Sequence, residues 1–171
     1  MSEHLPKVTY IIIGSKERLS RVKSYQIEKG AECLLCPFQS LEELPSLLDL
    51  KIAELDSSVI SLIPAGAFPK KDARAQLEHF SGSEFHFWGW YHFGNKFKGA
   101  AQSIGKINTL LNKVPQLEQG IFFSRLLYFS VGGLGDSGLN PFAELAKRFY
   151  LRLDPQNPLP SLTIRAKSLL N

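Results

Sequence analysis

The sequence of 171 residues has few of the features that would assign it to a specialised class of protein. Two cysteines, Cys33 and Cys36, are too few for a disulfide framework, so we expect reduced thiols and a cytoplasmic location. The apolar runs over 8–13 and 121–131 fall well short of the roughly 20 residues that a membrane helix needs. The N-terminus has no basic region followed by an apolar core. We therefore expect neither secretion nor a membrane contact.

The short motifs of common enzymes are also missing. There is no Gly-x-Ser-x-Gly elbow, His-Glu-x-x-His zinc motif, Walker A loop or paired-carboxylate motif. The run Cys33-Leu34-Leu35-Cys36 has the spacing of a redox or zinc motif, but it falls within an expected strand and no second Cys-x-x-Cys accompanies it. We expect no metal and no cofactor, and whether the protein is an enzyme stays open.

Charge is unevenly distributed along the chain, although the net charge is only +4. Residues 7–29 carry six Lys or Arg against two Glu, and residues 31–56 carry six acids against one Lys. Residues 85–113 carry four Lys and no acid. Separate basic and acidic segments can steer a charged partner. They favour a protein partner or a homo-oligomer, with nucleic-acid binding through a basic helix over 96–113 as an alternative.

Strand and helix patterns alternate regularly along the sequence. Runs of β-branched and aromatic residues predict strands, and apolar residues at helical spacing predict helices between them. The expected strands are 8–13, 31–36, 59–63, 85–93 and 121–131, and the expected helices are 15–29, 41–55, 69–80, 96–114 and 141–153.

Five strand–helix units in a row predict an α/β domain with three layers, either Rossmann-like or flavodoxin-like. Its sheet would be mainly parallel, with five or six strands and helices on both faces. Residues 1–153 would form this single domain, and 154–171 a Pro-rich extension that packs on it or adds an edge strand. The order is similar to that of receiver domains, but Gly14, Pro64 and Val131 stand where that family needs acids and a lysine, which excludes a phospho-accepting receiver.

Ligands of open parallel sheets bind where the loops after the strands meet, at the carboxyl edge. Two of these loops would place Lys16 and Lys96 beside helix N-termini, which favour anions. A third loop, 133–138, has the Gly-x-Gly-x-x-Gly spacing of dinucleotide-binding turns, but too little chain follows it for the second half of such a unit. The candidate phosphate-binding residues are Gly14, Ser15, Lys16, Gly66, Asn95, Lys96, Gly133, Gly135 and Ser137.

Two side chains expected at this edge could move protons. His92 ends the aromatic strand and imidazoles exchange protons near neutral pH, whereas Asp136 is the main carboxylate expected at the edge. Our preferred hypothesis is a non-catalytic binding or interaction module within a protein assembly. The alternative is a nucleotide- or phosphoester-binding enzyme or sensor that uses Lys16, the 132–138 loop and either His92 or Asp136. Both site assignments require parallel strands that bring these loops to one edge.

Overall fold

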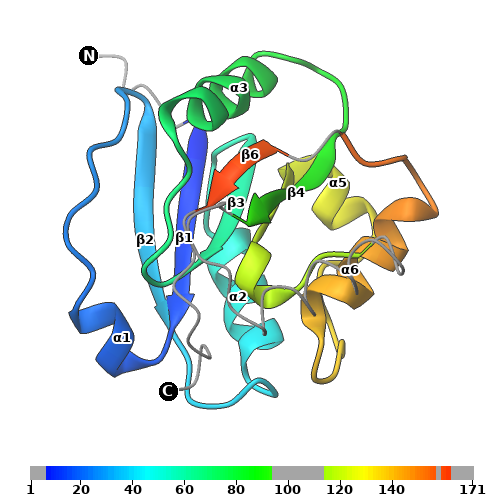
Figure 1. The fold of residues 1–171 in the computed structure, drawn as a ribbon. Coiled ribbons are helices and arrows are strands. Elements are labelled where there is room, and N and C mark those ends of the chain that lie inside the picture. Colours follow the sequence, from blue (N-terminus) through cyan, green and yellow to red (C-terminus); the bar gives the residue numbers. More distant parts are fainter. Residues whose placement is uncertain (1–6, 94–113, 157–158, 163–171) are drawn as a thin grey trace.

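The computed structural model describes residues 7–93, 114–156 and 159–162, and the statements that follow concern these residues. The strands are β1 (Val8–Gly14), β2 (Ala31–Pro37), β3 (Val59–Pro64), β4 (Trp88–Phe93), β5 (Ile121–Ser124) and β6 (Leu159–Leu162). The order β2-β1-β3-β5-β4 makes up a mixed sheet, and the short β6 continues it beside β4 (Figure 1).

The prediction of a mainly parallel, Rossmann-like or flavodoxin-like sheet is wrong. β1 pairs in parallel with β2 and β3, whereas β5 pairs antiparallel with both of its neighbours, β3 and β4. Trp90 in β4 lies opposite Ile121 at the start of β5, so the chain leaves β4 and enters β5 at the same edge of the sheet. Alternation of strand and helix patterns does not report direction, because a long connection can return to the edge that it left.

The expected strand over 121–131 is wrong in its second half. β5 ends at Ser124 and α5 (Arg125–Ser130) follows at once. The Ser124 hydroxyl accepts a hydrogen bond from the N–H of Leu127 at 3.4 Å, and serine is a favoured residue at such a helix start. The glycine-rich loop that follows therefore joins two helices, not a strand and a helix.

The expected helix over 15–29 is also much shorter in the structure. Only α1 (Lys16–Ser20) is helical, and the chain from 22 to 28 has no regular secondary structure. Val22, Tyr25 and Ile27 are spaced three and two residues apart, which does not make a helical stripe. These side chains instead pack against the hydrophobic cluster that includes Tyr10 and Ile12 of β1.

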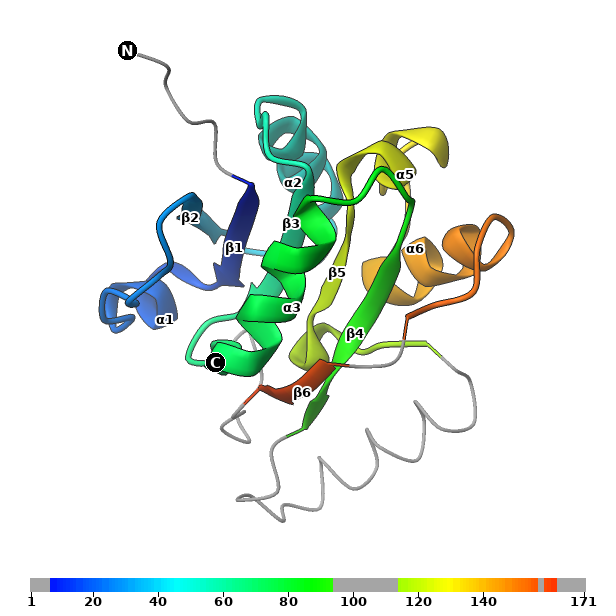
Figure 2. The same ribbon diagram turned by 90° about the horizontal axis from the view of Figure 1, so that it is seen from above.

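Three further helices lie close to where they were expected: α2 (Leu44–Ala53), α3 (Lys71–Ser81) and α6 (Pro141–Tyr150). α3 packs on one face of the sheet, and α2, α5 and α6 pack on the other (Figure 2). Residues 96–113 of the helix expected over 96–114 lie outside the described residues. In the part of the chain that the structure describes, no helix combines the length and the apolar character needed to cross a membrane.

The aromatic strand β4 lies in the core and forms hydrogen bonds with the chain that follows α6. Trp88 is fully buried and Trp90 is 8% exposed. The indole N–H of Trp88 donates to the carbonyl of Leu153 at 2.8 Å, and the N–H of Gln156 donates to the carbonyl of Trp88, also at 2.8 Å. β6 then pairs in parallel with β4, so the C-terminal extension adds an edge strand.

Candidate functional site

The turns after β1, β2 and β3 lie at one edge of the sheet. Gly14 is paired with Pro37, and Ile13 with Pro64. The N–H of Phe38 donates to the carbonyl of Gly14 at 3.1 Å, and the N–H of Ala65 to the carbonyl of Ile13 at 2.7 Å. His92 near the end of β4 stands at the same edge, and its side chain is exposed. The structure therefore brings the turns at 14–16 and 64–66 and the end of β4 to one edge.

Gly14 and Gly66 have structural roles in these turns. A Cβ atom on Gly14 would lie 2.8 Å from the Cβ of Ala65, so this glycine allows two neighbouring turns to pack together. Gly66 has a φ of 88°, which glycine adopts without strain. Burial raises the pKa of Tyr25, and a hydrogen bond to the backbone of Gly66 opposes that rise. Gly66 thus also contacts the chain that follows α1.

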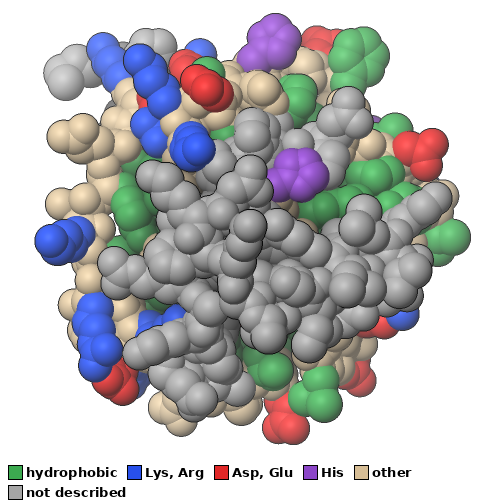
Figure 3. Space-filling view, in the orientation of Figure 1, with side chains coloured by type: hydrophobic (Ala, Val, Ile, Leu, Met, Phe, Trp, Pro, Cys, Tyr) green, Lys and Arg blue, Asp and Glu red, His purple; other side chains and the backbone are tan. Residues whose placement is uncertain are grey.

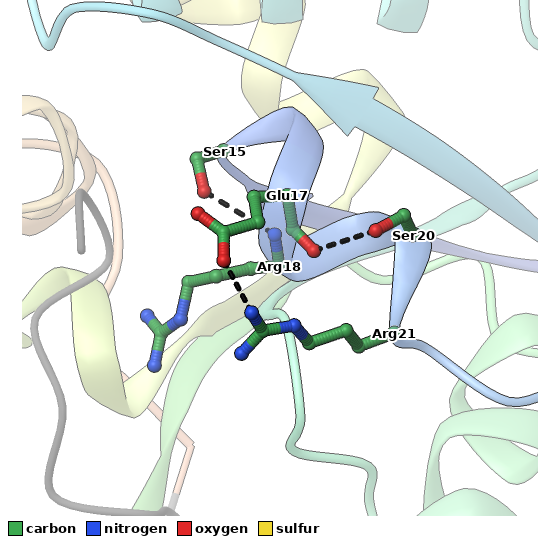
Figure 4. Close-up of polar contacts among 5 residues, drawn as sticks. All are labelled: Ser15, Glu17, Arg18, Ser20 and Arg21. Carbon is green, nitrogen blue, oxygen red and sulfur yellow. Dashed lines mark hydrogen bonds and ion pairs between the residues drawn. The ribbon is translucent and has the colours of Figure 1, made fainter.

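The predicted phosphate-binding serine is used within its own helix. The Ser15 hydroxyl accepts a hydrogen bond from the N–H of Arg18 at 3.3 Å, and Glu17 forms an ion pair with Arg21 (Figure 4). The hydroxyl of Ser20 donates to the carbonyl of Glu17 at 2.7 Å. Since α1 has only five residues, the dipole at its start is small. Lys16 is exposed beside this turn.

Arg18 is a residue of this edge that sequence reasoning missed. Its side chain points away from the Glu17–Arg21 pair (Figure 4). Burial lowers the pKa of its guanidinium, and the negative charge of Glu118 opposes the shift. Glu118 belongs to the short 3-10 helix η1 (Leu117–Gln119), just before β5. Arg18 therefore links α1 electrostatically to the start of β5.

The glycine-rich loop binds an anion that belongs to the protein itself. The Asp49 carboxylate of α2 accepts hydrogen bonds from the N–H of Leu134 at 2.9 Å and from the N–H of Gly135 at 2.9 Å. The hydroxyl of Tyr128 donates to the same carboxylate. On the other side of the loop, Arg148 of α6 donates to the carbonyl of Gly133 at 2.9 Å. The loop thus connects α2, α5 and α6 around one carboxylate.

The geometry of this loop depends on its glycines. Gly132, Gly133 and Gly135 have φ values of 81°, 68° and 52°, in the left-handed region that favours glycine. A Cβ on Gly133 would stand 2.7 Å from an Asp49 oxygen. Burial raises the pKa of Tyr128 well above its ordinary value, and the hydrogen bond to Asp49 raises it further. Tyr128 therefore remains a protonated donor to Asp49 over the physiological pH range.

The structure places the predicted residues of the glycine-rich loop away from the edge at Lys16 and His92; these residues are Gly133, Gly135, Asp136 and Ser137. Because β5 is antiparallel to β3, it ends opposite Val59, at the far edge of the sheet. The loop that follows α5 then packs on α2 and α6, so the exposed Asp136 lies with these helices. Ser137 is 5% exposed, and its hydroxyl has no hydrogen-bond partner in the structure. Asn95 and Lys96 lie outside the described residues.

An exposed basic surface follows the edge of the sheet at β2. We call Lys16, Lys23 and Lys29, on α1 and the chain after it, the basic edge. Figure 3 shows Lys and Arg side chains on this side of the molecule, over α1 and the chain that follows it. The acids of the same segment are engaged, since Glu17 pairs with Arg21, and Glu28 pairs with Arg74 at 2.8 Å. Among the described residues, the acids of this segment therefore do not neutralise the positive charge of the basic edge.

The acidic segment over 31–56 behaves differently. Glu32 accepts a hydrogen bond from Thr9 at 2.6 Å, Glu43 accepts one from the N–H of Ser40 at 3.3 Å, and Asp49 binds the glycine-rich loop. Half of the acids in this segment thus accept hydrogen bonds from other groups of the protein. The acidic surface is correspondingly weaker than the sequence suggests.

The two cysteines, Cys33 and Cys36, are free thiols in the described part of the chain. Among the residues that the structure describes, no group of three or more His, Cys, Asp and Glu side chains could hold a metal ion. Burial raises the pKa of the Cys33 thiol to about 11, which makes it unreactive near neutral pH.

Neither a protein-family model nor a curated protein sequence matches the chain. The function is therefore inferred from the geometry of the chain itself.

Proposed function

We propose that this protein is a non-catalytic interaction module that docks an acidic protein surface through the basic edge, within a larger assembly. The observation that carries the proposal is that Lys16, Lys23 and Lys29 are exposed while Glu17 and Glu28 are held by arginines. Unneutralised charge of one sign speeds association with an oppositely charged partner and fixes its orientation.

Two observations favour a protein partner over a nucleic acid. Leu35 of the neighbouring β2 is 47% exposed, and protein interfaces combine apolar contacts with a charged rim. Trp88 and Trp90 are buried in the core, so they are not available to stack on bases. Single-stranded nucleic acids are bound by exposed aromatic side chains next to basic grooves.

The separation of the reactive groups supports the non-catalytic part of the proposal. Acid–base catalysis needs a donor and an acceptor within hydrogen-bond reach of one substrate. Asp136 lies with α2 and α6, away from the edge at which His92 stands. The Ser15 hydroxyl and the Asp49 carboxylate are both occupied by backbone N–H groups.

Binding of poly-L-glutamate, measured by calorimetry at two salt concentrations, tests this proposal. We expect salt-sensitive binding that weakens by about tenfold or more in the double variant K16E/K23E, since several surface charge contacts of up to about 1 kcal/mol each are reversed. The matched control K147E/R152E has the same change in net charge, on α6 and on the chain just after it, and it should retain most of the affinity.

Three outcomes would contradict the proposal. Equal weakening in both double variants would mean that only net charge matters. Binding of a single-stranded oligonucleotide with no binding of poly-L-glutamate would point to nucleic acid. Turnover of a nucleotide by the purified protein would show that the module is catalytic.

A further inference from the structure

The polar cluster around Asp49 has the composition of an anion-binding site. One carboxylate receives two backbone N–H groups, from Leu134 and Gly135, and the phenolic hydroxyl of Tyr128. The guanidinium of Arg148 lies close by, since one of its nitrogens would be 3.6 Å from a Cβ on Gly135. Successive backbone N–H groups in a turn with left-handed residues form a concave site for anions. The donors that would hold a phosphate are thus present, and a side chain of the same chain occupies them.

The loop has anchors that do not involve Asp49. Leu134 is fully buried and belongs to the same hydrophobic cluster as Phe142 and Leu145 of α6. The bond from Arg148 to the carbonyl of Gly133 holds the loop from the side of α6. If the carboxylate of Asp49 is removed, these contacts still hold the loop in place. Its two N–H groups would then face the space that the carboxylate has left.

Charge around the cluster also changes in the direction that favours an anion. The Asp49 carboxylate and the Arg148 guanidinium bond to neighbouring residues of the loop, while Glu144 of α6 is paired with Lys147 at 2.6 Å. Loss of Asp49 leaves the positive guanidinium beside the N–H of Gly135 and beside the N–H of Leu134, which keeps only a 3.3 Å hydrogen bond to the Tyr128 hydroxyl. Buried or half-buried donors of this kind bind charged acceptors more strongly than neutral ones.

We propose that the glycine-rich loop is an oxyanion receptor held closed by its own Asp49, so that it binds a phosphate-type anion only when this carboxylate is withdrawn. Asp49 is thus an autoinhibitory contact from α2 to the turn between α5 and α6. The proposal does not depend on the basic edge. It explains why a loop with phosphate-binding spacing binds a side chain of its own protein when no anion is bound.

Thermal denaturation of the variant D49A in inorganic phosphate tests the inference, with sodium chloride used to keep ionic strength constant. We expect phosphate at tens of millimolar to raise the Tm of D49A by about 3 °C, as linkage predicts for a site with millimolar affinity. Wild type should not respond. The variant D136A is the matched control, because it removes one negative charge from an exposed position of the same loop.

Amide resonances of Leu134 and Gly135 provide a second measurement. They should shift with phosphate in D49A and remain unchanged in wild type and D136A. If D49A fails to fold, D49S replaces it, because the short serine side chain also leaves the space of the carboxylate open, and a saturable response is again expected. The inference is overturned if neither variant at Asp49 responds to phosphate, or if wild type, D136A and the Asp49 variants all respond equally.

Discussion

The α1 turn and the glycine-rich loop, the two segments whose sequences most suggest a phosphate, satisfy their donors in different ways. In the glycine-rich loop, backbone N–H groups bind the carboxylate of Asp49, 85 residues away from Leu134. At α1, the Ser15 hydroxyl accepts from the N–H of Arg18 in its own helix, and Lys16 remains exposed. A glycine-rich spacing therefore predicts a backbone that surrounds an acceptor, but it does not reveal whether that acceptor is a ligand or a side chain.

The two segments also differ in how they are held to the rest of the protein. Charge-assisted hydrogen bonds from the backbone fix the glycine-rich loop. The chain after α1 is held by side chains: Tyr25 stacks on Phe68 with ring centroids 4.1 Å apart, and Arg74 pairs with Glu28 and lies 5.5 Å from the Phe68 ring. We expect substitutions in the loop to cost more stability than substitutions in the segment after α1.

The largest effect is expected for Gly133→Ala. The left-handed backbone costs a residue with a Cβ about 1–2 kcal/mol, and displacement of Asp49 would break hydrogen bonds to a charged group, for a total loss of about 3 kcal/mol or more. Gly132→Ala is the matched control, because it also has a positive φ but its Cβ would meet nothing within 4 Å. It should lose only about 1 kcal/mol. Urea denaturation measures both, and equal losses would mean that the contact with Asp49 does not determine the loop.

Local sequence patterns predict the first three strands better than they predict β5. The strands β1, β2 and β3 were predicted almost to the residue, since β1 and β3 have β-branched runs that end at Gly14 and Pro64, and the apolar run of β2 lies between Gly30 and Pro37. The direction of β5 was not predictable from local pattern, because it depends on the edge to which the chain returns. The stretch 121–131 was predicted as a long strand, although Phe122, Leu126 and Phe129 would also suit a helix. The strand ends at its fourth residue, Ser124, which caps α5.

The candidate site could be predicted only in part, for a related reason. The turn at 14–16 is found at the carboxyl edge because it depends on β1 alone. The role of Asp49 depends on contacts between α2 and two helices much later in the chain. Its one local signal is a carboxylate that interrupts a run of leucines, with Leu47 and Leu48 before it and Leu50 after it. Such a residue on the inner side of a helix is worth testing as a partner for a distant loop.

An intermediate effect is expected for Tyr25→Ala in the segment after α1. Loss of the stacked pair with Phe68 should lower the free energy of unfolding by about 1–2 kcal/mol. Cys33 packs in the same cluster as Tyr25, so its reaction with a thiol reagent at pH 8 should become several-fold faster, while the fully buried Cys36 stays protected. Tyr25→Phe keeps the ring and is the control. Unchanged labelling of Cys33 in Tyr25→Ala would show that the segment does not cover this part of the sheet.

The smallest effect is expected for Ser15→Ala, which removes the cap of a helix of only five residues. The loss should be about 0.5–1 kcal/mol, whereas Ser20→Ala, at the exposed end of α1, should change stability by less than about 0.5 kcal/mol. Thermal denaturation with and without inorganic phosphate separates the two roles of Ser15. If its hydroxyl only caps α1, the difference between wild type and Ser15→Ala is the same at every phosphate concentration. A difference that grows with phosphate would mean that this turn binds the anion after all, and that the contrast with the glycine-rich loop does not hold.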